Sequence, residues 1–209
     1  MGRRSMVRRQ SSEGVLNFLR AEDQRLVPWK NGCGVTREVA VYSDKGMGPE
    51  FLWRVSIAIV NKDGPFSIFE GVDRTIAVMH GDGIILHSGG NSVSLTPTSE
   101  PHAFKGELPV EASVMESQTT DLNVMSRREC FDHSMERLVL KNTVAIDGEA
   151  DETLIVFNGP MSAKLPAGLF SARQFDAITG IGRGSRVYLF PEGESEVFVI
   201  RVSAKPLSR

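Results

Sequence analysis

Short segments of strictly alternating apolar and polar residues constrain the fold more than any other feature of this 209-residue sequence. Within residues 51–60 every odd position is apolar, namely Phe51, Trp53, Val55, Ile57 and Ile59. Arg54, Ser56 and Ala58 fall between them and share the opposite face. A period of two is that of a β-strand, because successive side chains of a strand point to opposite sides. Residues 51–60 therefore predict a strand with one apolar and one polar face.

The same pattern recurs along the chain, with clusters of glycine, proline, asparagine and aspartate between the segments. Residues 35–42 and 121–126 alternate in this way, and 74–79 run into a His-Gly-Asp-Gly turn before an apolar segment resumes. Short, regular strands joined by such turns are typical of a barrel or jelly roll. The predicted fold class is all-β, although a short helix over the apolar group at 15–19 is left open.

The strands fall into two groups. After a cluster of charged residues between 127 and 137, the β pattern starts again. We therefore expect a first barrel over 15–130, which holds the ligand pocket, and a smaller second barrel over 131–209 with a mainly structural role. Residues 1–14, which include four arginines, are predicted to be a disordered basic leader.

The charge balance argues against several classes of function. The 24 basic and 26 acidic residues are mixed along the chain, so no basic surface for nucleic acid or for an anionic membrane is expected. No apolar segment approaches the roughly 20 residues that span a bilayer, and none follows the basic leader as an export signal requires. Two cysteines, Cys33 and Cys130, make no disulfide framework and suit a reducing compartment. We expect a cytoplasmic protein without nucleic-acid or membrane partners.

Five blocks of the sequence, in order and in register, resemble the HutD/Ves family. They are WKNGCGVTRE at 29–38, WRVSIA at 53–58, GPFSIF at 64–69, GVDR at 71–74 and DLNVM at 121–125. The resemblance implies two tandem cupin-type barrels, of the double-stranded β-helix or jelly-roll kind, in a cytoplasmic bacterial protein associated with histidine degradation. It also implies that the protein senses or buffers a pathway intermediate such as urocanate or formylglutamate, and no catalytic reaction is established for the family.

Arginines on the strands of the first barrel indicate a site for a carboxylate. Arg37, Arg54 and Arg74 lie on strands that also carry an apolar face, so each is solvated, paired with a protein carboxylate or directed at a ligand. A guanidinium holds a carboxylate through two parallel hydrogen bonds, and two guanidinium groups suit a dicarboxylate. Surface ion pairs with the adjacent Glu38 and Asp73 are the alternative.

Neutral polar and aromatic residues complete the predicted pocket. Trp29 is expected in a loop and is a better ligand contact than Trp53, which belongs to an apolar face, while Phe66 and Phe69 are candidate walls. The predicted ligand-binding residues are Trp29, Asn31, Thr36, Arg37, Arg54, Ser56, Phe66, Ser67, Arg74, Asp121 and Asn123.

Metal and nucleophilic chemistry are disfavoured. The four histidines, at positions 80, 87, 102 and 133, lack the close pair of metal-binding cupins, although a site assembled from separate strands stays open. Cys33 has no assignable histidine partner, and the glycines of 179–184 precede a strand rather than a helix. We expect neither a metal nor another cofactor.

Three functions are compatible with these residues. The main prediction is a non-enzymatic protein that binds a small carboxylate and regulates or buffers histidine catabolism. The second is a metal-independent isomerase or lyase on a small polar metabolite, with Asp121, Glu38 or His102 as acid or base. The third is an interaction module whose second barrel recruits a partner, and exposed strand edges make a homodimer a reasonable expectation.

Overall fold

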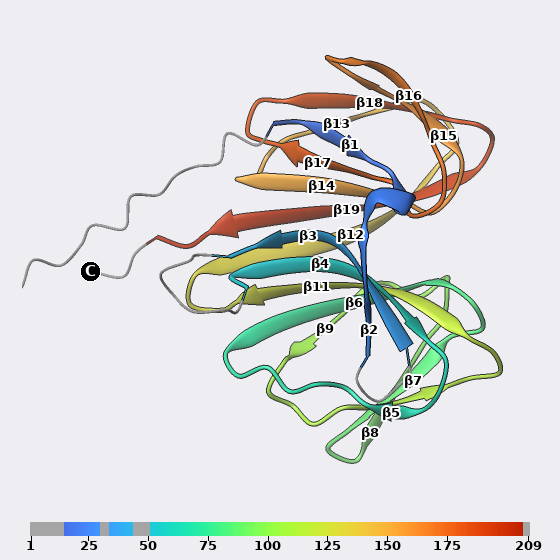
Figure 1. Cartoon of the computed structure of the whole chain (residues 1–209), viewed down its shortest axis with the longest axis vertical. Helices are drawn as coiled ribbons and strands as arrows, with labels where there is room; N and C mark the ends of the chain where they lie inside the picture. Colours follow the sequence, from blue (N-terminus) through green and yellow to red (C-terminus); the bar gives the residue numbers. More distant parts are fainter. Residues whose placement is uncertain (1–14, 30–33, 44–50, 207–209) are drawn as a thin grey trace, which may run out of the picture.

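The computed structural model describes residues 15–29, 34–43 and 51–206, and in this part of the chain it contains β-strands and a single 3-10 turn but no α-helix. The predicted all-β class is confirmed. Four sheets form two barrels, each made of one larger and one smaller sheet (Figure 1).

The first barrel combines a six-stranded and a four-stranded sheet. The larger sheet contains, in order, β2 (Arg25–Pro28), β3 (Gly34–Tyr42), β4 (Trp53–Val60), β11 (Thr119–Arg127), β6 (Val72–His80) and β9 (His102–Lys105). The smaller sheet contains β5 (Gly64–Pro65), β10 (Glu111–Val114), β7 (Ile84–Ser88) and β8 (Asn91–Leu95).

The second barrel combines a five-stranded and a four-stranded sheet. The larger sheet contains β1 (Asn17–Leu19), β17 (Ala177–Ile181), β14 (Glu152–Phe157), β19 (Ser195–Ala204) and β12 (Phe131–Leu140). The smaller sheet contains β13 (Val144–Asp147), β18 (Arg186–Pro191), β15 (Met161–Leu165) and β16 (Gly168–Ala172).

The two larger sheets pack against each other in the middle of the molecule (Figure 1). Val55 and Ile57 of β4 belong to the same buried cluster as Phe198 and Ile200 of β19, and all four side chains are almost fully buried. The apolar face that the alternation predicted is therefore directed at the other barrel at Trp53, Val55 and Ile57, whereas Phe51, which precedes the strand, packs with Met125 and Phe69 instead. The polar face of the same strand is left to face the interior of the first barrel.

The interior of the second barrel is filled with apolar side chains. Phe157, Met161 and Leu189 are fully buried in one cluster, and Phe18 of β1 stacks on Phe170 with the ring centroids 4.9 Å apart. Close packing of this kind is typical of a structural core.

The N-terminal segment crosses between the barrels, and here the predicted domain boundary differs from the structure. Residues 15–130 were expected in the first barrel, yet β1 pairs with β17 of the second, as a strand and not as a helix. The pairing joins residues more than 150 positions apart, which no local pattern in the sequence reveals. Residues 1–14, the expected basic leader, lie outside the described residues.

A segment that we call the strap, residues 20–28, links β1 to the first barrel and includes the 3-10 turn η1 (Ala21–Asp23). The buried Asp176 accepts hydrogen bonds from the Arg20 guanidinium at 2.9 Å and from the Ala21 amide at 2.8 Å. The Gln24 side chain donates to the carbonyl of Phe175 at 2.7 Å. The last part of the strap forms β2, which pairs with β3 in the first barrel.

The shared core predicts that the barrels unfold together. Phe157→Ala removes a fully buried ring from the second barrel, and we expect it to lower the free energy of unfolding by about 3 to 5 kcal/mol. Both tryptophans of the chain, Trp29 and Trp53, come from the first barrel, and Trp53 lies in the shared core, so tryptophan fluorescence reports on the first barrel and on its contact with the second. We expect the denaturant midpoints from fluorescence and from far-ultraviolet circular dichroism to shift equally.

The control is Leu169→Ala, because Leu169 is 67% exposed and its truncation is expected to change the stability by no more than about 0.5 kcal/mol. An unchanged fluorescence midpoint in Phe157→Ala, together with a separate early transition in circular dichroism, would show that the barrels unfold independently.

Candidate functional site

A pocket of about 620 Å³ opens in the first barrel, and its polar floor comes from the larger sheet. The floor residues are Thr36 and Glu38 of β3, Arg54, Ser56 and Ala58 of β4, Asp121, Asn123 and Met125 of β11, and Arg74 of β6. The remaining walls are Val27 and Pro28 of the strap, Trp29, and the residues Pro65, Phe66, Ser67 and Phe69 from the segment after β4.

Strand alternation explains why polar side chains meet here. On β4 and β11 the residues between the pocket positions, such as Val55 and Leu122, are buried against the second barrel. Each strand therefore contributes every second residue to the pocket.

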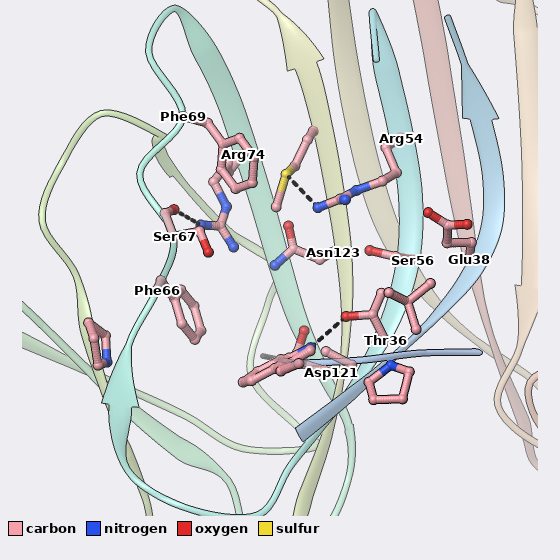
Figure 2. Close-up of a pocket in the computed structure, with 16 residues that line it drawn as sticks. Thr36, Glu38, Arg54, Ser56, Phe66, Ser67, Phe69, Arg74, Asp121 and Asn123 are labelled. Atoms are coloured by element: carbon pink, nitrogen blue, oxygen red, sulfur yellow. Dashed lines mark hydrogen bonds between the residues drawn. The ribbon is translucent and has the colours of Figure 1, made fainter. Parts of the chain in front are cut away.

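The strand register arranges the floor of the pocket in three layers. Met125 is paired with both Arg54 and Arg74, so the two arginines flank it in one layer. Two residues further along β11, Asn123 is paired with Ser56, and two further still Asp121 is paired with Ala58. Figure 2 shows the arginines at one end of the pocket, Ser56 and Asn123 in the middle, and Asp121 with Thr36 at the other end.

Arg74 is a buried cation between aromatic rings. Its side chain is 5% exposed, and its guanidinium carbon lies 5.0 Å from the ring centroid of Phe66 and 4.9 Å from that of Phe104. The guanidinium donates one long hydrogen bond of 3.4 Å to the carbonyl of Ser67, and its Nε finds no acceptor in the described part of the chain. Burial lowers the pKa of Arg74 to about 10, and the charge of Asp121 opposes this shift.

Arg54 has a similar environment on the neighbouring side of Met125. Its guanidinium carbon lies 4.9 Å from the ring centroid of Phe51, and its Nη2 contacts the Met125 sulfur at 3.4 Å. Within the described residues no acceptor reaches its Nε. Burial lowers the pKa of Arg54, while the charge of Glu38 raises it.

Asp121 lies at the opposite end of the pocket and is 1% exposed. Neither of its carboxylate oxygens has a hydrogen-bond partner among the described residues. Burial raises the pKa of Asp121 to about 7, although the charge of Arg74 and the nearby side-chain amide of Asn123 act in the opposite direction.

Three other polar residues of the pocket, Glu38, Trp29 and Thr36, are already paired, whereas the buried Oδ1 of Asn123 has no partner among the described residues. Glu38 forms an ion pair of 3.4 Å with Arg25 of the strap. The Trp29 indole donates to the hydroxyl of Thr36 at 2.8 Å, and the Trp29 ring lies close to Gly34, where a Cβ would come within 2.4 Å of the Ile59 carbonyl oxygen. Glycine at this position therefore permits the close approach of β4 and Trp29.

The structure brings most of the predicted site residues together. Those that line the pocket are Trp29, Thr36, Arg54, Ser56, Phe66, Ser67, Arg74, Asp121 and Asn123. Asn31 lies outside the described residues.

Arg37 is a correction to the predicted site. It is on the face of β3 that carries Val39, and its guanidinium donates to the carbonyl of Ala21 in the strap. The ion pairs that the sequence allowed also have other partners, because Asp73 accepts from Arg128 at 2.8 Å and Glu38 pairs with Arg25.

Several lining residues were missed as ligand contacts by the sequence analysis. Glu38, Ala58 and Met125 share the alternation of Thr36, Ser56 and Asn123, so this pattern was sufficient to find them. Val27, Pro28 and Pro65 carry no such signal, because they come from segments whose position depends on tertiary contacts.

The histidines are scattered across the structure. His87 bonds the hydroxyl of Ser92 at 2.8 Å, and His133 lies between Ser126 and Thr75 at 2.7 and 2.9 Å. Among residues 15–29, 34–43 and 51–206, no group of three or more histidine, cysteine, aspartate or glutamate side chains is placed to hold a metal ion. The same residues contain no helix of the length and apolarity needed to span a membrane.

Comparison with known proteins assigns the family. The family model for HutD matches residues 21–187, which is well over half of the chain. The chain belongs to the HutD family. This is a cupin family associated with histidine utilisation, and the resemblance of the five sequence blocks is thereby confirmed.

Curated relatives support the same assignment. The chain is 40% identical over 111 residues to an uncharacterized 21.2 kDa protein of the hutC 3′ region of Pseudomonas putida, covering 53% of this chain and 57% of that protein. It is 35% identical over 102 residues to the protein Ves of Citrobacter koseri, covering 48% and 52%. The matches thus span about half the length of these relatives.

Solved structures share the two-barrel architecture. A conserved protein of unknown function from Pseudomonas aeruginosa superposes with a TM-score of 0.79 at 26% identity, covering 90% of this chain and 98% of that one. HutD from Pseudomonas fluorescens gives a TM-score of 0.77 at 24% identity, covering 91% and 100%. The bacterial pirin YhhW of Escherichia coli gives 0.62 at 12% identity, covering 92% and 99%, and the likeness to such two-cupin proteins confirms the predicted fold class.

The buried carboxyl of Asp121 predicts a pH-dependent gain of stability in Asp121→Asn. Because the folded-state pKa of about 7 lies above the reference value of 3.8, the folded protein binds the extra proton between these values and loses stability as the pH rises. The stability of the variant relative to the wild type is therefore expected to increase from pH 4 to pH 7 and then level off. The gain is on the order of 4 kcal/mol, which urea unfolding at a series of pH values measures. A difference that does not change with pH would show that Asp121 titrates normally.

The scattered histidines predict that the protein folds without a transition metal. After purification without added metal and dialysis against a chelator, we expect far less than one iron, manganese, nickel or zinc per chain and an unchanged melting temperature. About one metal ion per chain that survives dialysis and whose removal lowers the melting temperature would contradict this.

Proposed function

We propose that this protein binds a small carboxylate metabolite in the pocket of its first barrel without transforming it, and that it thereby regulates or buffers histidine catabolism. The observation that carries the proposal is a pair of arginines, the buried Arg74 and the half-buried Arg54, which flank Met125 in one layer and whose Nε atoms have no partner among the described residues. Both residues line the pocket.

The energetics of buried charge support an anionic ligand. A buried guanidinium without full hydrogen bonding costs several kcal/mol of solvation, and the faces of aromatic rings return only part of it. A carboxylate between Arg54 and Arg74 supplies the missing acceptors and a compensating charge. Phe66 and Phe69 provide apolar walls for the carbon skeleton of the ligand.

The association of the HutD family with histidine utilisation selects the first ligands to test. Formylglutamate has two carboxylates, one for each arginine, whereas urocanate has one carboxylate on a flat conjugated skeleton that fits between aromatic side chains. A protein that binds such an intermediate without turnover lowers its free concentration, or adopts a ligand-bound state that another component of the pathway recognises.

The raised pKa of Asp121 favours one alternative, a metal-independent isomerase or lyase. A carboxyl group with a pKa of about 7 suits general acid-base catalysis near neutral pH. Incubation of the purified protein with urocanate or formylglutamate, followed by chromatography, distinguishes the two functions. Enzyme-dependent loss of either compound, abolished in Asp121→Asn, would replace binding by catalysis as the function.

Thermal-shift measurements followed by calorimetry test the proposal. We expect urocanate or formylglutamate to raise the melting temperature, because a ligand that binds only the folded state stabilises it. Arg54→Lys and Arg74→Lys keep the charge but lose the planar pair of donors, and we expect each to weaken binding by about 1 to 3 kcal/mol, or about 5- to 150-fold.

The control is Arg186→Lys, because Arg186 lies in the second barrel in an exposed ion pair with Asp147. It is expected to bind the ligand like the wild type. If neither compound nor a wider set of small carboxylates shifts the melting temperature, or if both lysine variants bind as tightly as the wild type, the proposal is wrong.

A further inference from the structure

The end of the pocket opposite the arginines is acidic. Along β11, Met125 belongs to the arginine layer and Asp121 lies four residues away, which corresponds to about 13 Å along a strand. The layer between them contributes the neutral polar side chains of Asn123 and Ser56 and also Glu38 of β3, whose carboxylate is paired with Arg25. The pocket therefore has a cationic end, a middle layer whose one carboxylate is already paired, and an unpaired carboxylate at its far end (Figure 2).

Within the described residues no group lies within hydrogen-bond distance of this carboxylate, and the nearby side-chain amide of Asn123 offsets its burial only in part. The strand neighbours of Asp121 in its own layer are Ala58 and Val78, which have no polar side-chain atoms. The Thr36 hydroxyl accepts a hydrogen bond from the Trp29 indole and donates none to Asp121, so both Asp121 oxygens remain without a hydrogen-bond partner. An almost fully buried, unpartnered carboxylate in a pocket is costly to the free protein and is satisfied by a donor that the ligand brings.

The other charged groups of the pocket do not fill this role. Arg74 on β6 and Arg54 on β4 belong to the opposite layer, and Arg74 acts on Asp121 through its charge without a contact within hydrogen-bond distance. Glu38 on β3 is negatively charged and is held by Arg25 of the strap. The segment after β4 adds Phe66 and Ser67 to the pocket and no charged side chain.

We propose that Asp121 is a specificity-determining residue that accepts a hydrogen bond from an N–H group of the ligand. The pocket then selects molecules with a carboxylate at one end and an N–H donor at the other. The inference rests on the proposed function, because it takes the arginine layer as the carboxylate site. It adds a second point of recognition, which distinguishes such molecules from carboxylates of the same shape that lack the donor.

Proton linkage gives this recognition a distinctive signature. An N–H donor stabilises ionised Asp121, so the affinity for a donor ligand is maintained or rises as the pH increases through 7. A ligand with no N–H leaves the carboxylate unsatisfied, so it binds the protonated form and loses up to about tenfold in affinity per pH unit above the pKa. The preference for the donor ligand therefore grows with pH.

The test uses matched analogues of urocanate whose rings do not titrate in this range. In the pyrrole analogue a pyrrole ring with its N–H replaces the imidazole, and in the furan analogue an oxygen takes the place of that N–H. Urocanate itself is measured first, as the reference ligand for the arginine layer. Calorimetry at about pH 6 and about pH 8 then gives the ratio of the dissociation constants of the furan and pyrrole analogues.

For the wild type we expect the pyrrole analogue to bind more tightly, and the ratio to rise at least about fivefold between the two pH values. In Asp121→Asn the residue stays neutral, so the ratio is expected to be independent of pH. Glu38→Gln is the comparison variant, and whatever its effect on affinity, the rise of the ratio with pH is expected to persist. A melting curve of each variant without ligand verifies that it is folded.

Equal binding of both analogues by the wild type at both pH values, with urocanate still bound, overturns the role of Asp121 and leaves the arginine site intact. If the ratio still depends on pH in Asp121→Asn but no longer does so in Glu38→Gln, the donor is recognised by Glu38 and not by Asp121. This outcome also overturns the inference. If urocanate and both analogues fail to bind at all, the carboxylate site itself is wrong.

Discussion

The apolar contact between the two larger sheets is the interaction on which the rest of the structure depends. Strands β4 and β11 bury their apolar faces against β14 and β19 of the other barrel, in a core with side chains from both. A strand has two faces, so this contact frees the opposite face of β4 and β11 to be polar. In the second barrel, β14 is apolar on both faces, because Leu154 faces the shared core and Ile155 the barrel interior. The same architecture thus gives a first barrel with a polar pocket beside an apolar cluster, and a second barrel that is filled with apolar side chains.

The polar interior of the first barrel reduces its stability in exchange for recognition. Arg74 and Asp121 are almost fully buried, yet their opposite charges lie in different layers and do not form an ion pair. A direct pair would be more stable, but it would leave no charge for a ligand to satisfy. The cost is tolerated because the shared core and the filled second barrel supply the apolar burial that maintains the fold.

The alternation in the sequence was sufficient to predict the strands and most of the polar floor, because side-chain direction in a strand follows from position alone. Arg37 was placed wrongly although the pattern contained the answer, since it shares the face of Val39 and not that of Thr36. The pairing of β1 with β17 was beyond prediction, because it depends on contacts between distant parts of the chain. The charge state of Asp121 was equally hidden, since burial and missing partners are properties of the folded structure.

The second barrel, whose own interior is filled with apolar side chains, helps to position the pocket through the strap. Asp176 and the carbonyl of Phe175 hold Arg20, Ala21 and Gln24, and Phe175 adopts the left-handed conformation at φ 70°, which is unfavourable for a bulky residue. The surrounding contacts must therefore hold this turn in place. A few residues further on, the same strap provides the pocket wall at 27–28 and the partner of Glu38. The position of that wall is thus set by the second barrel, through the strap, as well as by the pairing of β2 with β3.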